Sequence, residues 1–298
     1  MTLNLLGMKA IPLQTLPESG FTPSVDECRT LIGPKTKAIV LVTPNNPTGA
    51  TYSPALIASF ATLAREKNLA LIIDETYRDF IITGSPPHTL FSTSTAPHPW
   101  RSTFIHLFSF SKSYCLPGHR LGAIPASPQL LASIKPILDT LQICPPRPIQ
   151  LALAPLLPSL RSFITDTAKQ LQTRHALFKA SLPHRWRVGA QGGYFAFVRH
   201  PFSRVKAEEV SKRLAEELGV VTLPSIFFSE ETRRRNDVNV DALAVVDWTL
   251  SEQVGEVEED DRWIRFSVAN VNDEKVTRVC ERLGESENIF RWTLEDAC

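Results

Sequence analysis

Four short apolar segments constrain the fold of this chain more than any other feature of its sequence. They cover residues 38–43, 69–73, 104–108 and 121–126, and their apolar residues run on continuously instead of alternating with polar ones. A strand with one face in water alternates, whereas a strand covered on both faces reads as a continuous apolar run. The pattern therefore predicts four β-strands that are buried on both faces.

A helix-like segment, residues 53–68, connects the first two predicted strands. Ser53 can cap it, because a serine side chain accepts a hydrogen bond from a backbone N–H group of the first turn, and Pro54 suits the first helical position. Its apolar residues share one face at helical spacing, namely Leu56, Phe60, Leu63 and Ala64. The order of strand, helix and strand predicts an α/β fold built on a mostly parallel sheet.

The pattern changes after about residue 158. A long helix, a strand, an amphipathic helix and two strands are predicted over residues 159–182, 192–198, 203–218, 219–223 and 263–269. These elements predict a second, smaller α/β unit. A polar, charge-rich stretch over residues 229–262 precedes the last strand, and its composition is typical of a solvated loop or a partly disordered insertion.

Composition argues against several classes of function. The chain has 298 residues, which suits either one large α/β domain or one large and one small domain. Its formal net charge is +1, and it has no basic stripe for nucleic acid. No apolar stretch has the length of a membrane span, and the N-terminus lacks the pattern of a signal peptide. The five cysteines are scattered without C-x-x-C spacing, which favours reduced thiols, no metal site and a cytoplasmic location.

A polar cluster follows three of the predicted strands directly. The clusters are TPNNPTG at residues 43–49, DETY at 74–77 and SFSK at 109–112. Because parallel strands point the same way, all three clusters should meet at the carboxyl edge of the sheet, where open α/β sheets bind their ligands. Taken singly, each has a structural explanation: Asn46 can form a turn, Asp74 can cap a helix and Tyr77 can belong to the core. Their common placement favours a binding site.

Four motifs occur in order along the chain: TPNNPTG, DETYRDF, SFSKSYCLPGHRLG and WIRFSVAN. In sequence and order they resemble the class I/II aminotransferases, which have the type I fold of enzymes that depend on pyridoxal 5'-phosphate (PLP). The resemblance runs from Lys9 to about Asn270. It implies a three-layer, mostly parallel PLP-binding large domain over residues 1–158. It also implies an interdomain helix and a small C-terminal α/β domain over residues 159–298.

The resemblance implies a role for each polar residue of the first three motifs. Lys112 would form a Schiff base with PLP and move the proton between the substrate α-carbon and the cofactor. Asp74 would face the pyridine nitrogen and keep it protonated, so that the ring can accept electrons. Asn46 and Tyr77 would hydrogen-bond the phenolic oxygen of the cofactor.

Arg120, Ser109 and Ser111 would bind the phosphate of PLP, and Arg265 would bind the α-carboxylate of the substrate. An arginine suits both tasks because its guanidinium grips phosphate or carboxylate oxygens with two parallel hydrogen bonds. Arg120 follows Lys112 by eight positions, so one loop would carry both the covalent anchor and the phosphate ligand. Outside the motif, Arg265 would read as a surface charge on an edge strand.

The chain departs from the pattern of the family in three places. Relatives carry further elements ahead of the position that matches Met1, among them a helix whose backbone N–H groups bind the PLP phosphate and an aromatic residue that stacks on the ring. These elements have no counterpart in this sequence, and two explanations stay open. The sequence is a piece of a longer chain, or the protein is short, in which case we expect PLP binding to be weakened. The other departures are the insertion over residues 229–262 and Ser225, where relatives usually have a glycine after the proline. Both concern the substrate pocket.

The function that the resemblance implies is amino-group transfer between an amino acid and a 2-oxo acid, in a homodimer with PLP as cofactor. Two alternatives stay open at this point. A C–S lyase, a decarboxylase or an aminocyclopropane-carboxylate synthase of the same fold uses the same lysine, aspartate and arginines. A truncated, non-catalytic relative is the second alternative, favoured by the short N-terminus and opposed by the intact site residues.

Overall fold

The computed structural model describes residues 6–82, 86–92, 99–228 and 259–295. Its contacts divide the chain into two compact units. The first unit comprises Leu13–Thr173 together with Gly192–Tyr194, and the second comprises Met1–Pro12, Arg174–Gln191 and Phe195–Cys298. The division falls within helix α7 (Arg161–Ser181), and the predicted domain boundary after residue 158 stays a prediction.

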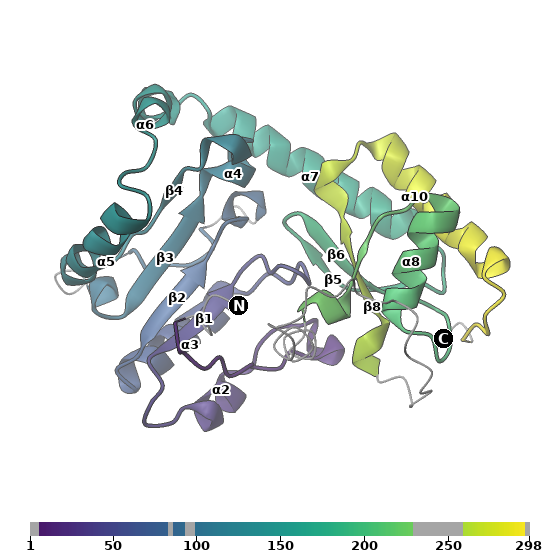
Figure 1. Ribbon diagram of the computed structural model, residues 1–298, viewed down its shortest axis with the longest axis horizontal. Coiled ribbons are helices and arrows are strands. Elements are labelled where there is room, and N and C mark those ends of the chain that lie inside the picture. The colour runs from purple at the N-terminus through teal and green to yellow at the C-terminus, as the bar shows by residue number, and fades with distance from the viewer. Residues whose placement is uncertain (1–5, 83–85, 93–98, 229–258, 296–298) are drawn as a thin grey trace, which may run out of the picture. The chain divides into compact units, whose positions relative to one another are not determined.

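A four-stranded sheet forms the centre of the first unit (Figure 1). Its strands lie in the order β1 (Ala38–Val42), β2 (Ala70–Asp74), β3 (Phe104–Ser109) and β4 (Gly122–Ala123). Neighbouring strands among the first three are parallel, and β4 pairs with β3 in the antiparallel sense. The predicted mostly parallel sheet is confirmed, while its fourth strand is shorter than residues 121–126.

The helix between β1 and β2 is α3 (Pro54–Glu66). The side chain of Ser53 accepts a hydrogen bond from the N–H of Leu56 at 3.2 Å, so the predicted cap is confirmed. Phe60, Leu63 and Ala64 are buried as predicted, but Ile57 takes the buried position expected for Leu56. The helix packs against β2.

The two faces of β1 differ in burial. Ile39 and Leu41 are buried, whereas Val40 between them is 57% exposed. Within the residues that the structure describes, β1 is therefore covered on one face, and the prediction of burial on both faces is wrong for this strand. A continuous apolar run indicates that both faces of a strand are apolar, but it does not indicate which elements cover those faces.

The described residues of the first unit form four further helices. They are α2 (Val25–Leu31), α4 (Phe110–Ser113), α5 (Pro128–Leu141) and α6 (Arg147–Leu153). The predicted long helix is α7, which begins two residues later and ends one residue earlier than expected. Among the described residues, no helix is long and apolar enough to cross a membrane.

A second four-stranded sheet lies in the second unit. Its order is β5 (Arg187–Gly192), β6 (Phe195–Arg199), β8 (Trp263–Ser267) and β7 (Leu223–Pro224). β8 pairs antiparallel with both β6 and β7. Helices α8 (Ala207–Leu218) and α10 (Asp273–Ile289) contact each other and share one hydrophobic core with the sheet. The predicted smaller α/β unit is thus present. The strand predicted over residues 219–223 is wrong except at Leu223, where β7 begins.

The polar stretch over residues 229–262 lies mostly outside the described residues. Its last four residues, Glu259–Arg262, form a 3-10 turn. Arg262 is buried there, donates to the carbonyl of His200 at 2.9 Å and pairs with Glu295. The prediction of a solvated loop is wrong at Arg262, because a residue from the far end of the chain neutralises its charge inside the unit.

Candidate functional site

The segment after β1 is a turn built around Asn45. Its Oδ1 accepts hydrogen bonds from the N–H of Thr48 at 3.1 Å and from the hydroxyl of Thr48 at 3.0 Å. Its backbone carbonyl accepts a further bond from the N–H of Gly49 at 2.8 Å. These bonds fix the loop that carries Asn46, whose peptide bond to Pro47 is cis. Asn46 is exposed and lies four residues after the end of β1.

Asp74 is the last residue of β2. The parallel register sets it beside Val42, the last residue of β1, and Leu107, two residues before the end of β3. Its Oδ1 accepts hydrogen bonds from the N–H of Thr76 at 3.0 Å and from the hydroxyl of Thr76 at 2.7 Å. The two bonds orient the carboxylate from within its own loop.

Lys112 lies in α4, the single helical turn that follows β3. Ser109 caps this turn, because its Oγ accepts a hydrogen bond from the N–H of Ser111 at 3.3 Å. The amine of Lys112 stands over the ring of Tyr194, with Nζ 5.5 Å from the ring centroid. Tyr194 is not among the site residues predicted from the sequence.

The pairing of β3 with β4 brings the backbone of Arg120 close to the segment Ser109–Ser111. Ser109 pairs with Gly122, and the N–H of Phe110 donates to the carbonyl of Leu121 at 3.1 Å. Arg120 directly precedes Leu121 in the chain, and its side chain is exposed. Its backbone φ is 50°, and its Nη1 donates a hydrogen bond to the carbonyl of Pro117 at 3.1 Å. Its backbone therefore lies next to the Ser109–Ser111 turn.

Tyr77 is buried, and its ring lies 5.2 Å from the ring of Tyr194. Tyr194 also stacks on Phe80 at 5.1 Å. Burial, followed by the charges of Cys115 and Tyr77, raises the pKa of Tyr194 to about 12. Its hydroxyl therefore keeps its proton at neutral pH and can act as a donor.

Arg265 lies on β8 in the second unit, apart in the sequence from the other predicted site residues. Its guanidinium is placed over the rings of Phe195 and Phe228, at 4.5 Å and 4.8 Å from their centroids. Stacking of this kind holds a planar guanidinium at a fixed tilt. Of the predicted residues, the ones that the sheet of the first unit brings to one edge are Asn46, Asp74, Tyr77, Ser109, Ser111, Lys112 and Arg120.

A buried charged cluster lies on the opposite face of this sheet. Glu75 follows Asp74 and, because side chains alternate along a strand, points the other way. Its Oε2 accepts from Nε2 of His106 at 2.8 Å, from Nε2 of His88 at 3.0 Å and from Nη1 of Arg78 at 3.1 Å. Burial acts to raise the pKa of Glu75, but the hydrogen bonds of His106 and His88 and the charges of His88 and Arg78 outweigh it and lower the pKa to about 2.

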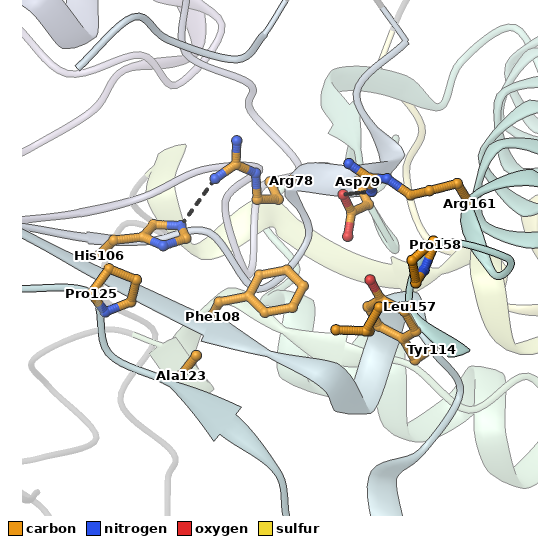
Figure 2. Close-up of a pocket in the computed structure, with 10 residues that line it drawn as sticks. All are labelled: Arg78, Asp79, His106, Phe108, Tyr114, Ala123, Pro125, Leu157, Pro158 and Arg161. Atoms are coloured by element: carbon orange, nitrogen blue, oxygen red, sulfur yellow. Dashed lines mark hydrogen bonds and ion pairs between the residues drawn. The ribbon is translucent and has the colours of Figure 1, made fainter. Parts of the chain in front are cut away.

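A cavity of about 460 Å³ adjoins this cluster. Figure 2 shows the ring of Phe108 between Arg78 and Tyr114, with His106 on one side. The distance between Nη1 of Arg78 and Nε2 of His106 is 3.3 Å. Phe108 alternates with Leu107, which neighbours Asp74, so the cavity lies on the face of the sheet away from Asp74. Two of its lining residues, Phe108 and Tyr114, lie on either side of the segment Ser109–Ser113 that carries Lys112.

Neither metal nor disulfide chemistry is found in the part of the chain that the structure describes. No group of three or more histidine, cysteine, aspartate and glutamate side chains there could hold a metal ion. The four cysteines within it are free, namely Cys28, Cys115, Cys144 and Cys280. The candidate site thus consists of an amine, a carboxylate, hydroxyls, an amide and a guanidinium, a donor set that suits an anionic organic ligand.

Comparison with known proteins identifies relatives of the chain. Residues 1–283 match the family described as "Aminotransferase class I and II". The chain is similar to aromatic-amino-acid aminotransferase 2 of Thermococcus litoralis, at 28% identity over 233 residues that cover 76% of this chain and 58% of the relative. It is similar to the aspartate aminotransferase of Sulfurisphaera tokodaii, at 28% identity over 222 residues that cover 72% of this chain and 54% of the relative.

Solved structures agree on the fold. The aromatic aminotransferase of Pyrococcus horikoshii superposes with a TM-score of 0.78 at 23% identity, over 96% of this chain and 69% of that structure. The predicted α/β fold is therefore confirmed. The chain spans little more than half the length of the curated relatives it matches.

Proposed function

Because the chain belongs to the class I and II aminotransferase family, we propose that it moves an amino group between an amino acid and a 2-oxo acid with PLP as cofactor. One observation carries the proposal. The parallel register of β1, β2 and β3 sets the residues that follow three strands at one edge, and the amine of Lys112 belongs to that edge. Open α/β sheets bind their ligands at this edge.

The donors at the edge match the functional groups of PLP. The cofactor carries a phosphate, a pyridine nitrogen, a phenolic oxygen and a carbonyl carbon. The backbone pairing that brings Arg120 next to Ser109 and Ser111 gives a guanidinium and two hydroxyl groups, which suit a phosphate. Asn46 and Tyr77 would donate to the phenolic oxygen, and Lys112 would hold the cofactor covalently through its amine.

Asp74 would accept the hydrogen bond of the protonated pyridine nitrogen. Thr76 already donates twice to Oδ1 of Asp74, so the carboxylate is oriented before any ligand arrives. When bound, PLP supplies a ring that accepts electrons and stabilises negative charge on the substrate α-carbon. A carboxylate opposite the ring nitrogen keeps the proton there that this chemistry needs.

Lys112 would also take the proton from the α-carbon of the substrate and deliver it in the second half of the reaction. A primary amine at the end of a short helical turn is suited to this task, because it can reach both the substrate and the cofactor from one anchored backbone position. The capping bond from Ser111 N–H to Ser109 Oγ fixes the start of that turn.

Arg265 would bind the α-carboxylate of the substrate. Its guanidinium lies over the rings of Phe195 and Phe228, which restricts its orientation. A guanidinium can bind a carboxylate through two parallel hydrogen bonds. The names of the relatives make aromatic amino acids and aspartate the first candidate substrates. The second substrate would be a 2-oxo acid.

We further propose a homodimer in the cytoplasm. Three apolar side chains on and directly after α5 are largely exposed, namely Ile137, Leu141 and Ile143. Exposed apolar groups that lie this close together are more typical of an interface than of a surface in water. Sedimentation velocity on the purified chain tests the dimer, and Ile137→Glu should shift the chain toward monomer.

The proposed reaction is tested with the purified chain, PLP, a panel of amino acids and 2-oxoglutarate as acceptor. We expect a new 2-oxo acid and glutamate in equal amounts, and a loss of more than about a hundredfold for Lys112→Ala. Lys135→Ala is the matched control, because Lys135 is an exposed lysine that pairs with Asp139 on the surface of α5. Release of ammonia or carbon dioxide without an acceptor would instead indicate a lyase or a decarboxylase. No turnover by the folded chain would contradict the proposed activity.

A further inference from the structure

The turn that carries Tyr194 joins β5 to β6 but packs against the loops of the candidate site. Gly193 has a φ of 53°, a conformation that residues with a Cβ rarely adopt. A Cβ on Gly193 would lie 3.0 Å from Cβ of Tyr77 and 3.1 Å from Cβ of Pro44, and one on Gly192 would lie 2.5 Å from the carbonyl oxygen of Gly49. Two adjacent glycines therefore let this turn approach both the Asn46 loop and Tyr77.

The close approach places Tyr194 against Lys112 in two ways. The hydroxyl of Tyr194 donates a hydrogen bond to the backbone carbonyl of Lys112 at 3.2 Å. The face of its ring lies 5.5 Å from Lys112 Nζ, within the range of a cation–π interaction. Tyr77 and Phe80 pack on the same ring at 5.2 Å and 5.1 Å, which holds the ring in place.

We propose that Tyr194 is a positioning residue for Lys112. Its hydroxyl fixes the backbone of α4, and its ring binds the ammonium group of Lys112 and holds the amine in one place whenever that amine is not bonded to another group. The functional meaning of this contact rests on the proposed function, whereas the contact itself does not depend on a cofactor.

The contact has a measurable consequence in the chain without PLP. The ring covers one face of the Lys112 amine and holds the amine in place, so it slows the attack of this amine on formaldehyde. A cation–π contact at a partly exposed site corresponds to a change of about two- to fivefold in such a rate. Tyr194→Phe keeps the ring and removes the hydroxyl, whereas Tyr194→Leu removes both.

The test is reductive methylation of the PLP-free chain with formaldehyde and cyanoborohydride, mapped by mass spectrometry. The rate at Lys112 is divided by the rate at Lys135, an exposed lysine of α5, in the same sample. We expect Tyr194→Leu to raise this ratio about two- to fivefold and Tyr194→Phe to change it less than about twofold. If Tyr194→Leu fails to fold by circular dichroism, Tyr194→Met replaces it, because methionine fills irregular space without a ring.

Tyr114→Leu is the matched control. Tyr114 follows α4 directly and stacks on Phe110 at 5.2 Å, so its loss disturbs the same helical turn without removing the ring at Lys112. An unchanged ratio in Tyr194→Leu, or an equal rise in Tyr114→Leu, would overturn the inference.

A second measurement separates this inference from the proposed function. The folded wild-type chain is incubated with PLP, and the rate at which borohydride traps PLP on Lys112 is followed. Formaldehyde reaches the amine from any open side, whereas PLP bound at the sheet edge requires the amine at one position. We therefore expect the trapping rate to fall at least about twofold in Tyr194→Leu and to stay near wild type in Tyr114→Leu. If the wild-type chain never traps PLP on Lys112, the proposed function fails, while the methylation ratios still decide the role of Tyr194.

Discussion

Removal of the charge of Glu75 should destabilise the first unit more than any change at the candidate site. The side chain is fully buried, and three donors from His88, His106 and Arg78 converge on its Oε2. The N–H of Leu90 donates to Nδ1 of His88 at 3.2 Å, so the proton that His88 donates to Glu75 is on Nε2. The carboxylate is thus the common acceptor of the whole cluster.

The magnitude follows from the pKa of Glu75. The folded chain lowers it from 4.5 to about 2, which corresponds to roughly 3 kcal/mol of stability at pH 7. A carboxyl whose pKa is lowered by folding contributes fully above pH 4.5, and the contribution is lost as the pH falls toward 2. Glu75→Gln has no such group, so the difference from wild type should shrink to about 1 kcal/mol at pH 3.

Urea unfolding read by hydrogen exchange in peptides of β2 and β3 measures this effect within the first unit. Glu66→Gln is the matched control, because Glu66 forms a surface ion pair with Arg29 at 2.9 Å in which both side chains are more than 40% exposed. We expect that variant to lose less than about 1 kcal/mol at pH 7. A loss in Glu75→Gln no larger than in Glu66→Gln, or a difference from wild type that does not change with pH, would refute the reasoning.

Three further predictions concern other parts of the chain. Gly193→Ala should lower the free energy of unfolding in urea by about 2 kcal/mol, because the added Cβ would meet Tyr77 and Pro44 and the φ of Gly193 is positive. Gly118→Ala is the control, since the space around Gly118 is open, and it should lower the free energy of unfolding by less than about 1 kcal/mol. Arg265→Gln should raise KM for the amino acid by at least about tenfold with a smaller change in kcat, and steady-state kinetics measures both. Burial, and then the charge of Arg262, lowers the pKa of His200 from 6.5 to about 3, so the second unit should lose stability as the pH falls from 6.5 toward 3. In His200→Asn the free energy of unfolding should depend less on pH over this range. Acid titrations followed by tryptophan fluorescence measure the difference.

Local signals in the sequence predicted the elements that depend on neighbouring residues. β1, β2 and β3 lie within one residue of the predicted strands, because short apolar runs bounded by polar clusters define both ends. The cap of α3 by Ser53 was predicted for the same reason, since a cap involves residues three positions apart. Helix α5 was not predicted, although Ser127 caps it and Pro128 occupies its first turn; Pro136 inside it disguises the helical pattern.

Contacts between distant residues could not be predicted in this way. Nothing near Tyr194 in the sequence indicates that its hydroxyl bonds to Lys112, 82 residues away. The glycine pair before Tyr194, read as part of a strand, was the available signal, because two glycines before an aromatic residue allow a close approach of the backbone. The burial of Glu75 was equally hidden, since its partner His88 lies in a loop and His106 lies on another strand.

For the site residues, too, their placement could be predicted from local signals in the sequence, whereas their chemical roles could not. Their order along the sheet edge follows from the parallel register, which the alternation of strand and helix predicts. Their chemical roles came from the resemblance of four motifs, and these roles stay proposals. Arg265 is an example, because its stacking on Phe195 and Phe228 is a structural fact and its carboxylate ligand is an expectation.

The most direct test of the account is to add PLP to the purified chain, reduce the mixture with borohydride and map the modified residue by mass spectrometry. The account predicts a pyridoxyl group on Lys112 and its absence from that position in Lys112→Ala. A folded chain that is modified at other lysines as strongly as at Lys112, or that is not modified at all, would contradict it.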